Sequence, residues 1–109
     1  MIFSMHSLEE RGWEKAEGYP EGTLIKVLRN ENGCKTALLK LPPHFRMDAH
    51  THLNAEQHFV VEGNYMINNI AFGPGSYQRI PPNEEHGSFM SPEGATVLVI
   101  WDRVEEPVS

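Results

Sequence analysis

The sequence predicts an all-β domain, and three observations favour that class. Eight prolines and nine glycines interrupt the chain at short intervals and leave segments too short for most helices. Those segments are rich in β-branched and aromatic residues, and several alternate between polar and apolar side chains. Short strands joined by tight turns are typical of a sandwich, a jelly roll or a small closed barrel.

Six segments between the turns have the character of strands. In chain order they are residues 23–28, 34–41, 56–63, 65–72, 76–80 and 94–104. The helical candidate, residues 7–17, has Ser7 as an N-cap and Glu10 at the capping-box position, but Gly12 interrupts it. The apolar residues expected in the core are Phe59, Val61, Ile67, Ile70, Phe72, Phe89, Leu98 and Ile100.

Length and charge limit the class of protein. The chain has 109 residues, the size of one domain, so residues 1–109 are expected to share a single core. The formal charge is -6, and the nine Lys and Arg residues form no basic run. This argues against binding to nucleic acid or to an anionic membrane, and favours a small-molecule partner.

The cysteine content and the N-terminal sequence bear on the compartment. Cys34 is the only cysteine, which excludes an intrachain disulfide and fits a reducing environment. The sequence also lacks a leader pattern and an apolar run of about 18 residues. A cytoplasmic protein is therefore expected.

Histidines are concentrated just before and inside the third predicted strand. Along extended backbone His50 and His52 share one face, and Glu56 and His58 share one face. Imidazole nitrogen and carboxylate oxygen suit zinc, iron(II), nickel or manganese, and such a set can leave coordination positions open. The alternative for this segment alone is a polar loop with solvated histidines.

A second segment supports the metal site, because His86 follows a strand and a tight turn that can return a third imidazole to the same face. The two segments together resemble the cupin superfamily, whose motifs read G-x5-H-x-H-x3(or 4)-E-x6-G and G-x5-P-x-G-x2-H-x3-N. The residues that match these motifs at every spacing are His50, His52, Glu56, Gly63, Gly75, Pro81 and His86. The resemblance implies a double-stranded β-helix, the cupin jelly roll, with a divalent metal ion held by His50, His52, Glu56 and His86.

Three positions depart from the motifs without removing a ligand. His44 stands in place of the first glycine, Asn83 replaces the turn glycine, and Met90 replaces the final asparagine. Asn83 is a mild change, because asparagine tolerates the left-handed backbone conformation. His44 lies at even spacing from His50 and is a candidate for the cavity, but a solvated histidine at a sheet edge is the favoured interpretation.

The likeness extends over nearly the whole chain. Segments such as "GTLIKVL", "TALLKLPP" and "PEGATVLVIWD" are similar to the cupin domain of ChrR-type anti-sigma factors and to the small acetylacetone-cleaving dioxygenases. In the anti-sigma proteins the cupin follows a helical, zinc-binding domain that supplies its own cysteines. This chain has no room for that domain and has Cys34 alone, so the resemblance implies a free-standing metal cupin.

Further candidates lie near the expected metal centre. His58 should point into the barrel and is the candidate catalytic residue, as a hydrogen-bond donor to a bound substrate or oxygen species. The alternative is a core histidine bonded to a backbone carbonyl. Tyr77 and Arg79 alternate on one strand and point either toward the pocket mouth or toward solvent.

Two functions with the same ligands remain, and a third without a metal is the weakest. One is an oxygenase or lyase with iron(II) or a similar ion, acting on a small carbonyl-type substrate. The other is a non-catalytic zinc cupin that serves as a sensory or regulatory small-molecule module. The third is a jelly roll with no metal, in which the motif spacing is accidental. A homodimer is expected, because long apolar terminal strands would otherwise leave backbone groups open at a sheet edge.

Overall fold

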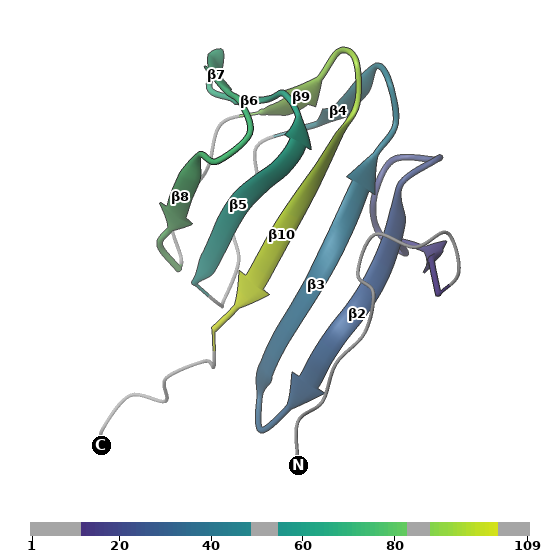
Figure 1. The fold of residues 1–109 in the computed structure, drawn as a ribbon, viewed down its shortest axis with the longest axis vertical. Helices are drawn as coiled ribbons and strands as arrows, with labels where there is room; N and C mark the ends of the chain where they lie inside the picture. The colour runs from purple at the N-terminus through teal and green to yellow at the C-terminus, as the bar shows by residue number, and fades with distance from the viewer. Residues whose placement is uncertain (1–11, 49–54, 83–87, 103–109) are drawn as a thin grey trace.

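The computed structural model describes residues 12–48, 55–82 and 88–102. The strands in these residues are β1 (Glu14–Lys15), β2 (Leu24–Glu31), β3 (Cys34–Leu41), β4 (Phe45–Met47), β5 (Glu56–Gly63), β6 (Tyr65–Ile67), β7 (Ile70–Phe72), β8 (Tyr77–Ile80), β9 (Phe89–Ser91) and β10 (Ala95–Trp101). They form a six-stranded sheet with order β1-β2-β3-β10-β5-β8 and a four-stranded sheet with order β4-β9-β6-β7. Figure 1 shows the strands of the smaller sheet gathered near one end of the long strands.

The predicted all-β jelly roll is confirmed, since each pairing given for the two sheets is antiparallel and residues of both sheets share one core. The helical candidate at residues 7–17 is wrong from residue 12 onward, and residues 7–11 lie outside the described residues. Gly12 has a φ of 88°, and Glu14–Lys15 pairs with β2 as strand β1. The described part of the chain therefore contains no helix that could span a membrane.

Asparagine determines two of the hairpin turns. Asn32 and Gly33 have φ values of 52° and 78° and connect β2 to β3, as the predicted break at this point requires. Residues 65–72 do not form the single strand that was predicted. Asn68 and Asn69, with φ values of 52° and 65°, turn the chain back on itself, so that β6 pairs with β7. Asparagine is among the few residues other than glycine that adopt this left-handed conformation readily.

The core lies between the two sheets, and its register differs in part from the prediction. On β5 and β10 the buried positions include Val60, Val97 and Val99, whereas Phe59 is 41% exposed. Because side chains alternate along a strand, a face that carries Glu56 and His58 must continue with Val60 and turn Phe59 outward.

The other predicted core positions divide into three groups. Phe89 is buried, and Ile67 and Phe72 pack against the core while partly exposed. Ile70 was also assigned to the core, but it is 59% exposed on β7, an edge strand of the smaller sheet. Val61, Leu98 and Ile100 are half-buried.

Gly63, which ends β5, is a position where alanine is expected to destabilise the fold strongly. Its φ is 74°, and a Cβ there would overlap the Gly94 carbonyl oxygen and lie 2.8 Å from the Ala95 Cα. Gly63→Ala should lower the free energy of unfolding by about 1–3 kcal/mol through backbone strain and by a similar amount, about 1–3 kcal/mol, through the overlap. Urea unfolding measures the sum.

Gly75→Ala is the matched control. Gly75 has a similar φ of 88°, but a Cβ there would meet no heavy atom within 4 Å. The control should therefore show the strain alone, and equal losses for the two variants would contradict the proposed overlap with Gly94.

Candidate functional site

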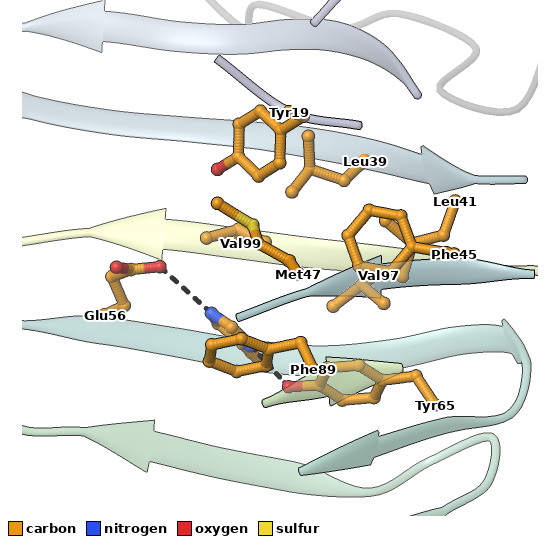
Figure 2. Close-up of a pocket in the computed structure, with 11 residues that line it drawn as sticks. Tyr19, Leu39, Leu41, Phe45, Met47, Glu56, Tyr65, Phe89, Val97 and Val99 are labelled. Carbon is orange, nitrogen blue, oxygen red and sulfur yellow. Dashed lines mark hydrogen bonds and ion pairs between the residues drawn. The ribbon is translucent and has the colours of Figure 1, made fainter. Parts of the chain in front are cut away.

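A cavity of about 40 Å³ lies between the two sheets. Its walls are largely apolar, with Leu39 and Leu41 from β3 and Val97 and Val99 from β10. The smaller sheet contributes Phe45, Met47 and Phe89. The polar groups come from Tyr19, Glu56, His58 and Tyr65, and Figure 2 shows how the labelled residues surround the space.

Glu56, His58 and Tyr65 form a hydrogen-bonded chain at this cavity. The Nε2 atom of His58 lies 3.1 Å from Oε1 of Glu56, and its Nδ1 atom lies 2.5 Å from the Tyr65 hydroxyl oxygen; the dashed lines in Figure 2 mark both contacts. The three residues are 4%, 7% and 2% exposed, respectively. These three hydrogen-bonded side chains therefore lie largely out of contact with water, where hydrogen bonds and charges have stronger effects than at the surface.

The local sequence explains why these groups meet. Glu56 and His58 are two residues apart on β5 and so point to the same face of the larger sheet. Gly63 and Asn64 then lead into β6, whose first residue is Tyr65, and β6 belongs to the opposing sheet. Residues seven apart in the sequence thus face each other across the interior.

Burial and the Glu56 charge together raise the pKa values of two tyrosines that line the cavity. Burial, with a smaller contribution from the Glu56 charge, raises the pKa of Tyr19 to about 12. The same two causes, in the same order, raise the pKa of Tyr65 well above its ordinary value. Both phenols therefore keep their protons at neutral pH and can donate hydrogen bonds into the cavity.

Aromatic packing limits the movement of the His58 and Tyr65 side chains. The rings of Tyr65 and Phe89 are stacked, with centroids 6.3 Å apart and an angle of 6° between their planes. The His58 ring lies 6.1 Å from the Phe89 ring and 5.9 Å from the Tyr65 ring. A shift of His58 would consequently disturb the core of the smaller sheet.

The structure places part of the predicted metal set. Glu56 is buried in the cavity, on the inner face of β5. His50, His52 and His86 lie outside the described residues, and within those residues no group of three His, Cys, Asp or Glu side chains is close enough together to hold a metal ion. The set of three histidines and one glutamate therefore stays a prediction.

The other sequence candidates point away from the cavity. Tyr77 is 56% exposed, lies opposite Phe59 on the outer face, and donates a hydrogen bond of 2.8 Å to Oε1 of Gln57. Arg79 shares that outer face and is also exposed. His44 is exposed as expected, with a φ of 63°, which explains why the motif has glycine at this position.

Several cavity residues could not be assigned from the sequence. Tyr19 lies between two turns and has no periodic pattern around it, and Tyr65 begins a three-residue strand. A further polar group lies on β8, where Gln78 is the cross-strand partner of His58. Both amide atoms of Gln78 are buried, and neither has a hydrogen-bond partner in the described portion of the chain.

Comparison with solved structures finds the same fold in proteins of low sequence identity. An acetylacetone dioxygenase from Acinetobacter johnsonii is 14% identical with a TM-score of 0.76, and the match covers 93% of this chain and 74% of that one. An RmlC-like cupin from Shewanella frigidimarina is 17% identical with a TM-score of 0.71, covering 94% of this chain and 95% of that one. These similarities show a shared fold.

The complex of SigE with the anti-sigma factor ChrR from Rhodobacter sphaeroides also matches, at 21% identity and a TM-score of 0.74. That match covers 89% of this chain but 52% of the other, so this chain spans about half of its length. No curated protein matches the sequence significantly. The family model of the ChrR cupin-like domain, however, matches residues 5–104, and the chain therefore belongs to the family of ChrR cupin-like domains.

Proposed function

We propose that this chain is a metal-dependent cupin that acts as an oxygenase or lyase on a small carbonyl-type substrate. The observation that carries the proposal is the Glu56 carboxylate, 4% exposed and turned into a cavity between the sheets. The proposed ligands are His50, His52, Glu56 and His86, the residues that match the two cupin motifs.

The donor set fits a divalent ion. A carboxylate buried among apolar side chains is costly unless it is paired with a cation or held by hydrogen bonds, and Oε1 of Glu56 lies 3.1 Å from Nε2 of His58. Imidazole nitrogens with one carboxylate suit iron(II) or zinc, and also nickel or manganese. When bound, the ion would supply a Lewis acid that polarises a substrate carbonyl.

The protein's own groups suit such a substrate. The apolar side chains of Leu39, Val97 and Val99 line the cavity beside Glu56 and His58, and they suit the carbon skeleton of a small substrate. His58 lies in this space with its Nε2 atom 3.1 Å from Oε1 of Glu56 and is the candidate general acid or base.

Metal analysis and oxygen uptake test the function together. The protein should be purified without oxygen, analysed for bound metals, and then mixed with a panel of small diketones while oxygen is recorded. Rapid oxygen consumption that depends on iron and on one of the diketones is expected for the oxygenase, and product formation without oxygen uptake for the lyase. Tightly bound metal with no turnover of any member would contradict catalysis.

The family match favours a second candidate. The model of the ChrR cupin-like domain covers residues 5–104, and one solved neighbour is an anti-sigma factor in complex with SigE. On this alternative the same ligands hold zinc, and the cavity binds a small molecule for sensing or regulation. One equivalent of zinc, no turnover, and saturable binding of a small ligand would support it.

Metal binding should be pH dependent under either candidate. Imidazoles bind metal as neutral ligands and have a reference pKa of about 6.5, so protons compete with the ion below that value. Bound metal stabilises the native state over the unfolded chain. A chelator should therefore lower the melting temperature more at about pH 7.5 than at about pH 5, and equal shifts would count against histidine ligands.

We also propose that the protein is a cytoplasmic homodimer. The long C-terminal strand β10 is paired on both sides, contrary to the expectation of an open edge there, and the edges of the larger sheet are the short strands β1 and β8. Phe59 and Tyr77 are cross-strand partners on the outer face of that sheet, with exposures of 41% and 56%. Sedimentation at micromolar concentration should give twice the 12.4 kDa mass of one chain. A mass near that of a single chain would refute the dimer.

A further inference from the structure

We propose that Tyr65 is a positioning residue for the candidate metal centre: its hydroxyl holds His58 so that the Nε2–H of this ring donates to Glu56. The inference rests on the proposed function in one respect, the role of Glu56 as a metal ligand. The contacts themselves are a 2.5 Å separation at Nδ1 and a 3.1 Å separation at Nε2.

We assign the hydrogen-bond directions for an ionised Glu56 carboxylate and a neutral His58 ring. An ionised carboxylate only accepts, so the proton of the contact with Glu56 belongs to Nε2 of His58. In the neutral ring Nδ1 then carries a lone pair, and the Tyr65 hydroxyl is the donor that faces it. The raised pKa of Tyr65 supports this direction, because burial and the Glu56 charge keep the phenol protonated.

This arrangement gives His58 a role other than that of a metal ligand. An imidazole binds a metal through a nitrogen lone pair. In His58 one nitrogen carries the proton donated to Glu56, and the lone pair of the other receives the phenol proton. In this arrangement neither ring nitrogen of His58 has a lone pair free to bind an ion.

The position of Tyr65 makes it a firm anchor for this chain. The residue is 2% exposed, its ring stacks on Phe89, and it belongs to β6 of the smaller sheet, whereas Glu56 and His58 belong to β5 of the larger one. The orientation of the carboxylate thus depends on the contact between the two sheets. Outer groups that orient ligands in this way typically change metal affinity by about 10–100-fold when they are lost.

Nitrogen NMR of the metal-free protein tests the hydrogen bonds directly. With ¹⁵N-labelled histidine, the His58 resonances are assigned by their loss in His58→Phe. We expect a proton on Nε2 and a hydrogen-bonded lone pair on Nδ1. In Tyr65→Phe the Nδ1 resonance should move to the position of a nitrogen without a donor. Tyr77→Phe, which removes an exposed phenol hydroxyl on the outer face, should leave it in place.

Metal affinity then tests the positioning role, with zinc as the probe and wild type, Tyr65→Phe and Tyr77→Phe compared by competition with a chromophoric chelator. Tyr65→Phe should bind zinc about tenfold more weakly, and Tyr77→Phe should match wild type. Phe keeps the stacked ring, and near-ultraviolet circular dichroism checks that the aromatic core is intact. Unchanged zinc affinity, or an unchanged Nδ1 resonance, would overturn the proposal.

A wild-type protein that bound no divalent ion would contradict the proposed function and the metal-positioning role with it. A wild-type protein that bound zinc, together with an insensitive Tyr65→Phe variant, would refute the role of Tyr65 and leave the metal centre standing.

Discussion

Glu56→Gln is expected to lose most of the bound metal while keeping the fold. Glutamine has nearly the same shape and can still accept the hydrogen bond from His58, but it lacks the negative charge of a carboxylate ligand. The loss of affinity should exceed the roughly 10–100-fold that removal of an outer group costs. Elemental analysis after gel filtration gives the metal content, and chelator competition gives the affinity.

Glu62→Gln is the matched control, because Glu62 lies on the same strand but is exposed. It should retain the wild-type metal content. A Glu56→Gln variant with nearly one equivalent of metal would exclude Glu56 from the ligand set.

The same variant has a readout that does not depend on metal. The Glu56 charge contributes to the raised pKa of Tyr19, about 12, so removing the charge should lower that pKa. Phenolate absorbance during an alkaline titration, with Tyr19→Phe to assign the step, measures the change.

The main features of the fold could be predicted because they are encoded locally. Turn residues such as Asn32 and Gly33 have backbone angles that few other residues adopt, so they mark the hairpins directly. Strand alternation likewise placed Glu56 and His58 on one face. The core assignment on β5 failed because hydrophobicity was followed instead of that alternation, which makes Val60, and not Phe59, the buried neighbour.

The contacts within the site could not be predicted from the sequence. Tyr65 meets His58 only because β6 and β5 belong to opposing sheets, and no periodic pattern in the sequence encodes a distance across the interior. Tyr19 enters the cavity from a segment between turns, and its neighbours in the sequence give no strand signal. The motif spacing identified candidate ligands, but it could not show that His58 links one of them to the smaller sheet.

His58→Phe is expected to reduce turnover by roughly a hundredfold or more, the usual effect of losing a positioned acid or base. The ring is 7% exposed, and Phe89 lies 6.1 Å away, so a phenyl ring suits the space. At saturating metal the variant should still fill its site, whereas His52→Ala should lose most of its metal with a proposed ligand.

The stability of this variant must be separated from its chemistry. Phenylalanine removes the partner of the Tyr65 hydroxyl and the donor to Oε1 of Glu56, and each group that loses its partner costs about 1–3 kcal/mol. The double variant His58→Phe with Tyr65→Phe also removes the hydroxyl and should recover part of this loss, which a double-mutant cycle measures.

Turnover at full metal occupancy decides the role of His58. If the single and the double variant are both folded, both filled with metal and both slow, the loss belongs to the proton-bearing imidazole and not to a disturbed core. A His58→Phe variant that sheds its metal as completely as His52→Ala would make His58 a ligand. Full turnover in a filled variant would remove it from the chemistry and leave it as the link between Glu56 and Tyr65.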